Sequence, residues 1–211
     1  SEFVIVYGRR RVGKTFLVDE YFKRTYDFSY VGGHNLSNAK QLRNFAKAVK
    51  RYAHLSKQPK FADWSEAFDA LTDWLESLPE GRKKVVFIDE MPWIDTPHSD
   101  FVEEFETFWN GWAARRRDIV LIASGSATSW MIDNIVENQG GLHCRITSNI
   151  YLQPFTLYEV GQYLRMRKCT WDRYQIVQAY MIVGGVPFYW SLLDTQLSLV
   201  QHIDRLFFQR N

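Results

Sequence analysis

Short apolar runs alternate along the chain with longer stretches in which apolar residues recur every three or four positions. The runs cover residues 3–7, 26–31, 84–88, 119–123 and 148–152. Continuous apolar runs of this length, rich in Val and Ile, are typical of strands that are buried on both faces of a parallel sheet. The pattern therefore predicts five strands.

The helical stretches between the runs cover residues 14–22, 38–53, 64–78 and 100–112. Three capping pairs mark helix starts, because an acceptor side chain precedes a Glu by three residues: Asp63 with Glu66, Asp100 with Glu103, and Thr156 with Glu159. Strands alternating with helices predict a doubly wound α/β sheet with helices on both faces.

No strand pattern follows residue 155. Helical spacing continues over 156–168, 171–183 and 197–208, and Gly184, Gly185 and Pro187 fit a helix end followed by proline at the next helix start. We expect an α/β core over residues 1–155 and a small helical lid over 156–211. A helical pattern still running at the last residues also suggests a fragment of a longer protein.

Composition narrows the class of protein. The 211 residues are 46% hydrophobic, and 26 basic against 24 acidic residues give a net charge of +2, which makes no strong electrostatic case for nucleic acid. Two cysteines form no disulfide framework, and no apolar stretch has the length of a membrane span. We expect a globular, cytoplasmic protein without a membrane segment.

The strongest chemical signal lies between the first run and the next helix. Gly8, Gly13, Lys14 and Thr15 fill the pattern G-x-x-x-x-G-K-[ST]. Glycines let successive backbone N–H groups point at one anion, and the helix N-terminus adds the positive end of its dipole. The motif predicts a polyphosphate site, with Lys14 on the β- and γ-phosphates and the Thr15 hydroxyl on Mg²⁺. The alternative is a turn that carries Lys-Thr by chance.

The third run ends in Asp89 and Glu90. Carboxyl ends of parallel strands share one edge of a sheet, so both carboxylates should lie beside the bound phosphates. Asp89 is then expected to hold Mg²⁺, and Glu90 to orient or deprotonate the attacking water. A helix cap and turn is the alternative, which the glycine motif in the same chain disfavours.

Three weaker candidates each have a structural alternative. Ser124 or Ser126, after the fourth run, could sense the γ-phosphate or cap the next helix. Arg145 could act as a finger into a neighbour's site or pair with a local acid. The run of arginines at 115–117 fits a helix end better than a nucleic-acid patch, and His143 reads as an ordinary loop histidine.

Four segments together resemble the archaeal-type ATPases, relatives of AAA+ proteins within the STAND group of P-loop NTPases. They are YGRRRVGKTFLV, VVFIDEMPW, LIASGSATSWM and the stretch from GGLHCRI to LQPFTLYEV. The resemblance implies a sheet of order 5-1-4-3-2, a Walker A loop over residues 8–15, a Walker B strand over 85–90 and a sensor at 124–126.

The resemblance also implies residue roles and a cofactor pair, ATP and Mg²⁺. Arg145 falls at the arginine-finger position, and Pro187 in Gly185-Val186-Pro187 falls where STAND lids touch the nucleotide. The resemblance also implies a segment before the first strand that helps to close the adenine pocket. The printed residues begin at that strand, so base specificity is not predicted. The implied nucleotide contacts are Gly8, Arg11, Val12, Gly13, Lys14, Thr15, Phe16, Ser126 and Pro187; the catalytic residues are Glu90, Lys14 and Arg145, and the metal ligands are Thr15 and Asp89.

Three functional hypotheses follow. The first is a Mg²⁺-dependent ATPase module, with low turnover when isolated, whose ATP or ADP state sets the lid angle and controls partners through a C-terminal effector region. A homo-oligomer is a further possible partner. The second is a nucleotide-gated switch that hardly hydrolyses. The third is a DNA-associated module that uses Arg9, Arg10, Arg11 and the arginines at 115–117, against which the near-neutral charge argues. A nucleotide kinase shares the glycine loop, but the Asp-Glu pair favours water activation.

Overall fold

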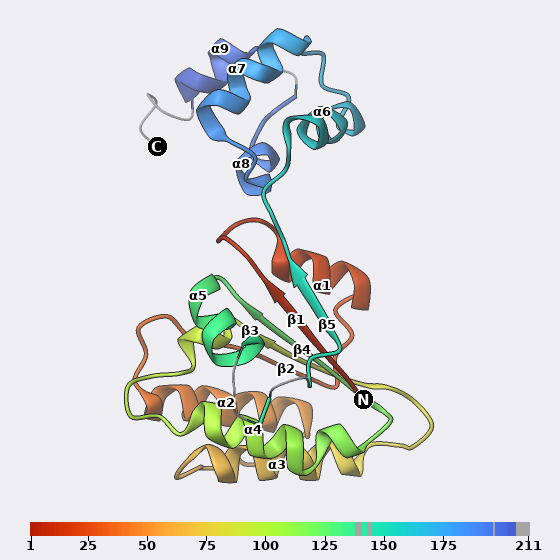
Figure 1. Ribbon diagram of the computed structural model, residues 1–211, viewed down its shortest axis with the longest axis vertical. Helices are drawn as coiled ribbons and strands as arrows, with labels where there is room; N and C mark the ends of the chain where they lie inside the picture. Colours follow the sequence, from red (N-terminus) through yellow and green to blue (C-terminus); the bar gives the residue numbers. More distant parts are fainter. Residues whose placement is uncertain (138–140, 143–144, 196, 206–211) are drawn as a thin grey trace. The chain divides into compact units, whose positions relative to one another are not determined.

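The computed structural model describes residues 1–137, 141–142, 145–195 and 197–205 (Figure 1). These residues divide into two compact units. The first comprises residues 1–8 and 14–151, and the second comprises residues 9–13 and 152–211. The middle of the glycine loop thus belongs with the C-terminal helices, whereas both of its ends belong to the first unit.

The first unit contains the strands and most of the long helices. Its elements are β1 (Glu2–Tyr7), α1 (Lys14–Phe22), β2 (Phe28–Val31), α2 (Asn38–Tyr52), α3 (Trp64–Ser77), β3 (Lys84–Asp89), the short helix η1 (Met91–Trp93), α4 (Phe101–Gly111), η2 (Ala113–Arg115), β4 (Ile119–Gly125), α5 (Thr128–Met131), the π-helical turn η3 (Ile132–Val136) and β5 (Ser148–Tyr151).

The five strands form one parallel sheet in the order β2-β3-β4-β1-β5. This confirms the expected order 5-1-4-3-2 and the P-loop type of α/β fold. β3 and β4 are almost entirely buried, as their apolar sequences require. The alignment of parallel strands brings the residues that follow β1, β3 and β4 to one edge of the sheet.

One face of the sheet packs against α2, α3 and α4, which lie side by side beneath it in Figure 1. An aromatic core fills this layer. Phe45 meets Trp64 edge to face with 5.3 Å between ring centroids, and Phe68 stacks on Phe108 at 5.2 Å. Such pairs add to the stabilisation from burying the rings, and they fix the helices against the strands that carry the site.

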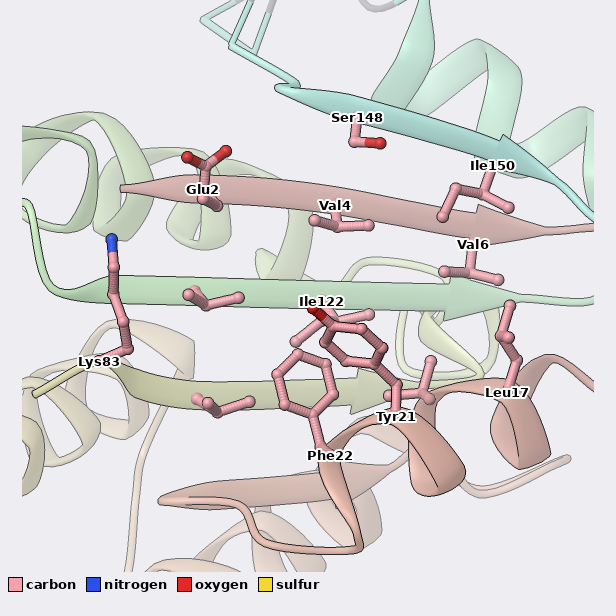
Figure 2. Close-up of a pocket in the computed structure, with 13 residues that line it drawn as sticks. Glu2, Val4, Val6, Leu17, Tyr21, Phe22, Lys83, Ile122, Ser148 and Ile150 are labelled. Carbon is pink, nitrogen blue, oxygen red and sulfur yellow. The ribbon is translucent and has the colours of Figure 1, made fainter.

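The opposite face is covered less completely. Val18 of α1 packs against Val6, Phe87 and Ile122 of the sheet. Beside this contact lies an apolar groove of about 510 Å³, in which Tyr21 and Leu17 of α1 face strand residues such as Ile122 (Figure 2). The expectation of helices on both faces is confirmed, and the cover of the two faces is unequal.

Helix starts test the predicted capping pairs. The Asp63 carboxylate accepts the Glu66 N–H at 3.0 Å, and Thr156 and Glu159 form a reciprocal capping box, so these two predictions are confirmed. The Asp100 pair is wrong as a capping box. Asp100 has φ −94° and ψ 14°, which is not the extended conformation of a capping residue, and the Ser99 hydroxyl accepts the Phe101 N–H instead at 3.1 Å.

The second unit contains α6 (Leu157–Met166), α7 (Arg173–Val183), α8 (Pro187–Ser191) and α9 (Leu199–Ile203). Its core includes Leu164, Trp171 and Trp190. Gly184 ends α7 with φ +66°, and Pro187 opens α8, as the sequence indicates. The predicted last helix, 197–208, is seen as α9, and its final residues lie outside the described part. No helix in the described ranges is long and apolar enough to cross a membrane.

Candidate nucleotide site

The glycine loop connects β1 to α1. Gly8 and Gly13 have φ angles of +144° and +99°, which residues with a Cβ atom rarely adopt. Both glycines are therefore required for the turn that brings the chain from the strand end to the first residue of the helix. This is the strand, loop and helix context that the motif needs in order to cradle phosphates.

Lys14 is the first residue of α1, and its side chain is buried. Its ammonium group donates to the Gly8 carbonyl oxygen and to the Ser126 hydroxyl oxygen, both at 3.0 Å. These two bonds connect the start of the loop, the start of α1 and the end of β4. The cation is held at the carboxyl edge of the sheet, where the motif predicts that it meets a polyphosphate.

Thr15 and Asp89 form the second contact of the site. The Thr15 hydroxyl donates to Asp89 Oδ2 at 2.7 Å, and the buried Ser124 hydroxyl donates to Asp89 Oδ1. The Glu90 N–H also donates to Oδ1, at 2.9 Å. Asp89 is buried and held in one orientation by three donors, two of which are hydroxyls.

Glu90 follows β3 in the left-handed conformation, with φ +50°. Non-glycine residues adopt this conformation at an energetic cost and are enriched at functional sites. Both carboxylate oxygens meet Ser126: its hydroxyl donates to Oε1 at 2.5 Å and its N–H donates to Oε2 at 3.1 Å. Ser126 thus touches both Lys14 and Glu90.

The segment after Glu90 is fixed by buried polar groups. The Gln41 side chain donates to the Trp93 carbonyl oxygen at 2.6 Å, and the Trp130 indole N–H donates to Asp95 at 2.8 Å. Burial raises the pKa of the Asp95 carboxyl, the Trp130 hydrogen bond opposes this, and the charge of Glu103 adds to it. These contacts keep the chain that carries Glu90 in place on α2 and α5.

The oxygen donors fit the predicted metal. Mg²⁺ prefers hard oxygen ligands and is commonly bound by one or two protein side chains together with substrate phosphates. A threonine hydroxyl beside a carboxylate is such a donor pair. Among the described residues, no group of three or more His, Cys, Asp or Glu side chains is placed to hold a metal alone.

The predicted site residues are only partly brought together. Lys14, Thr15, Asp89, Glu90 and Ser126 form one connected set at the carboxyl edge. Ser124, considered as a sensor, instead holds Asp89.

Of the remaining predicted nucleotide contacts, Gly8 joins this set through its carbonyl oxygen, and Gly13 belongs to the second unit. Arg11, Val12 and Pro187 belong to the second unit, and the Phe16 side chain is 68% exposed.

Arg145 lies elsewhere. It precedes β5, whose first residue, Ser148, pairs with Val4 of β1, so Arg145 is at the amino edge of the sheet. Its side chain is exposed. It is therefore at the opposite end of the strands from Lys14 and Asp89, and its role as a finger stays a prediction. His143 falls outside the described residues.

The arginine run at 115–117 is partly structural. Arg116 donates to both carboxylate oxygens of Asp118, each at 2.8 Å, and its guanidinium lies over Trp112.

The sequence did not predict the contact of Arg11 with Phe188 and Tyr189. These two residues are 177 and 178 positions from Arg11 along the chain. No local pattern signals a contact over that separation.

Known proteins resemble the chain over nearly its whole length. An uncharacterized protein of Methanocaldococcus jannaschii is 24% identical over an aligned length of 207 residues, and the alignment covers 94% of this chain and 43% of that protein. The chain thus spans less than half of this curated relative.

Two solved structures share the fold. The Walker-type ATPase of Pyrococcus abyssi has a TM-score of 0.62 and 16% identity, with 97% of this chain and 67% of that chain covered. A STAND protein with a tetratricopeptide repeat sensor from Pyrococcus horikoshii has a TM-score of 0.56 and 17% identity, with 99% of this chain and 30% of that chain covered.

The family comparison extends over most of the sequence. A sequence model described as "ATPase domain predominantly from Archaea" matches residues 1–193. The match includes the glycine loop, both carboxylates, Ser124 and Ser126 at the end of β4, and Pro187. The chain belongs to this family of ATPase domains.

Proposed function

We propose that the chain is a Mg²⁺-dependent ATP-hydrolysing module of STAND or AAA+ type, in which residues 156–211 act as a lid. ATP or ADP in the site would set the position of this lid and thereby control a partner, which could be a C-terminal effector region or a second copy. The STAND architecture of one structural neighbour supports this proposal.

The residues of the first unit have distinct tasks in the proposed reaction. Lys14 would neutralise charge on the β- and γ-phosphates, while Thr15 and Asp89 would hold Mg²⁺. When bound, the ion would neutralise phosphate charge and orient the β- and γ-oxygens. Glu90 accepts a proton from the water whose oxygen attacks the γ-phosphorus, and the bond from phosphorus to the β-γ bridging oxygen breaks to release ADP.

The observation that carries the proposal is the Ser126 contact. One hydroxyl accepts from the Lys14 ammonium and donates to the Glu90 carboxylate. The proposed phosphate-binding cation and the proposed general base are therefore bridged by a single hydroxyl group, beside the Thr15–Asp89 pair. This arrangement supports a site in which both groups act on one γ-phosphate.

Phosphate release from Mg·ATP at rising protein concentration tests the proposal. Glu90→Gln controls for contaminating ATPase, because the amide keeps the shape but cannot accept the proton. We expect the Gln variant to lose at least about 100-fold in rate while still binding ATP, and Lys14→Ala to lose ATP binding. ATP binding by Lys14→Ala as tight as by the parent would contradict the proposal. A specific activity that rises with concentration would indicate completion by another copy, and Arg145→Ala would be the next variant.

A second candidate is a nucleotide-gated switch that hardly turns over. The observation in its favour is that Ser126 donates to both oxygens of Glu90, so the base must be released before it can serve a water molecule. Tight ADP or ATP binding with phosphate release near the level of Glu90→Gln would favour the switch. Fast turnover by the dilute monomer would exclude it.

A further inference from the structure

Arg11, the fourth residue of the glycine motif, contacts α8 through its side chain and its backbone. Its guanidinium carbon lies 4.9 Å from the centroid of the Phe188 ring and 5.7 Å from that of Tyr189. Nη1 donates to the Tyr189 hydroxyl oxygen at 3.1 Å, and the Phe188 N–H donates to the Arg11 carbonyl oxygen at 3.4 Å. Two aromatic rings and two hydrogen bonds thus fix one residue of the loop.

The backbone of Arg11 is strained. Its φ is +69°, in the left-handed region where a side chain with a Cβ is disfavoured. Unlike Gly8 and Gly13, Arg11 cannot adopt this conformation without cost. Strained residues persist where surrounding contacts over-determine their conformation. The contacts with Phe188 and Tyr189 surround Arg11 in this conformation.

Helix α8, which carries Phe188 and Tyr189, is itself held by buried contacts. Trp190 of α8 is fully buried, and its indole N–H donates to the Gly184 carbonyl oxygen at 2.7 Å. The Arg167 side chain, which follows α6, donates to the Trp190 carbonyl oxygen at 3.0 Å. A displacement of α8 would therefore be passed on to α6 and α7.

We propose that Arg11 is a positioning residue that fastens the glycine loop to the lid. Its backbone N–H belongs to the loop that is proposed to bind the phosphates, whereas its side chain contacts Phe188 and Tyr189. A change of loop conformation on nucleotide binding is transmitted through the guanidinium to α8. This inference rests on the proposed function and specifies how the nucleotide state reaches the lid.

Amide hydrogen exchange of α8, followed by mass spectrometry, tests the inference. The parent, Arg11→Ala, Arg11→Lys and Phe188→Leu are compared without ligand and with saturating Mg·ADP, and ADP affinity is measured for each by calorimetry. Arg173→Ala, which removes an exposed arginine from α7, is the matched control. Tyr189→Phe removes the hydroxyl and keeps the ring.

We expect Arg11→Ala and Phe188→Leu to raise ligand-free exchange in α8 by about tenfold or more and to abolish its response to ADP. Arg11→Lys should fall between these variants and the parent, because it keeps the charge but loses the planar group that stacks. Phe188→Leu leaves the glycine loop unchanged and should bind ADP within about tenfold of the parent, so it separates the fastening role from any contribution of Arg11 itself to ADP binding.

Two outcomes would overturn the inference, and they differ. If Arg11→Ala binds ADP and α8 responds as in the parent, the fastening role is wrong and the proposed function stands. If the parent itself does not bind ADP or ATP, the proposed function is wrong, and so is the inference that Arg11 transmits the nucleotide state to α8.

Discussion

The two edges of the same parallel sheet hold their charged side chains in different ways. At the amino edge, opposite charges meet directly. Lys84 at the start of β3 is fully buried and lies 3.2 Å from Asp118, which also receives two hydrogen bonds from Arg116. Close by, Arg82 pairs with Asp27 at 2.6 Å. Charges paired in this way stabilise one arrangement and leave it little freedom to change.

At the carboxyl edge, hydroxyl groups stand between the charges. Ser126 connects Lys14 to Glu90, and Asp89 accepts from Thr15 and Ser124. A hydroxyl both donates and accepts, and it rotates at little cost. Side chains held in this way can exchange partners when a charged ligand arrives. In this sheet, linkage through hydroxyls lies at the edge that carries the candidate site, and direct ion pairing lies at the opposite edge.

The largest expected difference between the edges is in stability. Asp118→Asn leaves the buried Lys84 ammonium without its carboxylate, so we expect a loss of about 3–5 kcal/mol in the free energy of unfolding. Asp89→Asn removes a carboxylate whose hydroxyl donors can reorient, and the loss should be about 1 kcal/mol. Denaturant unfolding at pH 7 measures both. Equal losses of stability in the two variants would contradict the difference between the two edges.

A smaller effect is expected in the pH dependence of stability. The Arg116 hydrogen bonds, with help from Lys84, hold the pKa of the Asp118 carboxyl well below its usual range. A carboxylate with a lowered folded-state pKa contributes stability above its unfolded pKa, near 4, and loses it as the pH falls towards the folded-state value. Between about pH 4 and pH 2, stability should fall less steeply in Asp118→Asn than in the parent. Denaturant midpoints measured at several pH values test this, and equal slopes would assign the acid sensitivity to other carboxylates.

Much of the fold follows from local sequence, because strands buried on both faces need continuous apolar runs and helix starts need particular side chains. Asp63 and Thr156 illustrate this. Asp100 shows its limit: the same spacing fails because the backbone at Asp100 is not extended. The greater exposure of one sheet face was not predicted, because it depends on which elements pack on that face.

The candidate site was predictable where one short motif carries it. Lys14 and Thr15 follow from the glycine pattern, and Asp89 and Glu90 follow from the end of a buried strand. The Ser126–Glu90 contact depends on β3 and β4 being neighbours, which the resemblance implied and spacing alone did not. The Arg11 contact with Phe188 depends on packing across most of the chain, so no local signal reveals it.

The smallest expected effect is a difference between the two serines at the carboxyl edge, Ser124 and Ser126. Ser124 is fully buried and touches Asp89, while Ser126 touches Lys14 and Glu90. Under the proposed function, Ser124→Ala should raise the Mg²⁺ concentration for half-maximal ATP binding by about tenfold, because a side chain that orients a metal ligand commonly contributes 10–100-fold in metal affinity. Ser126→Ala should leave this Mg²⁺ requirement near the parent value and change phosphate release instead. ATP titrations at stepped Mg²⁺ concentrations distinguish the two serines, and an equal Mg²⁺ shift in both variants would mean that the hydroxyls act as one network.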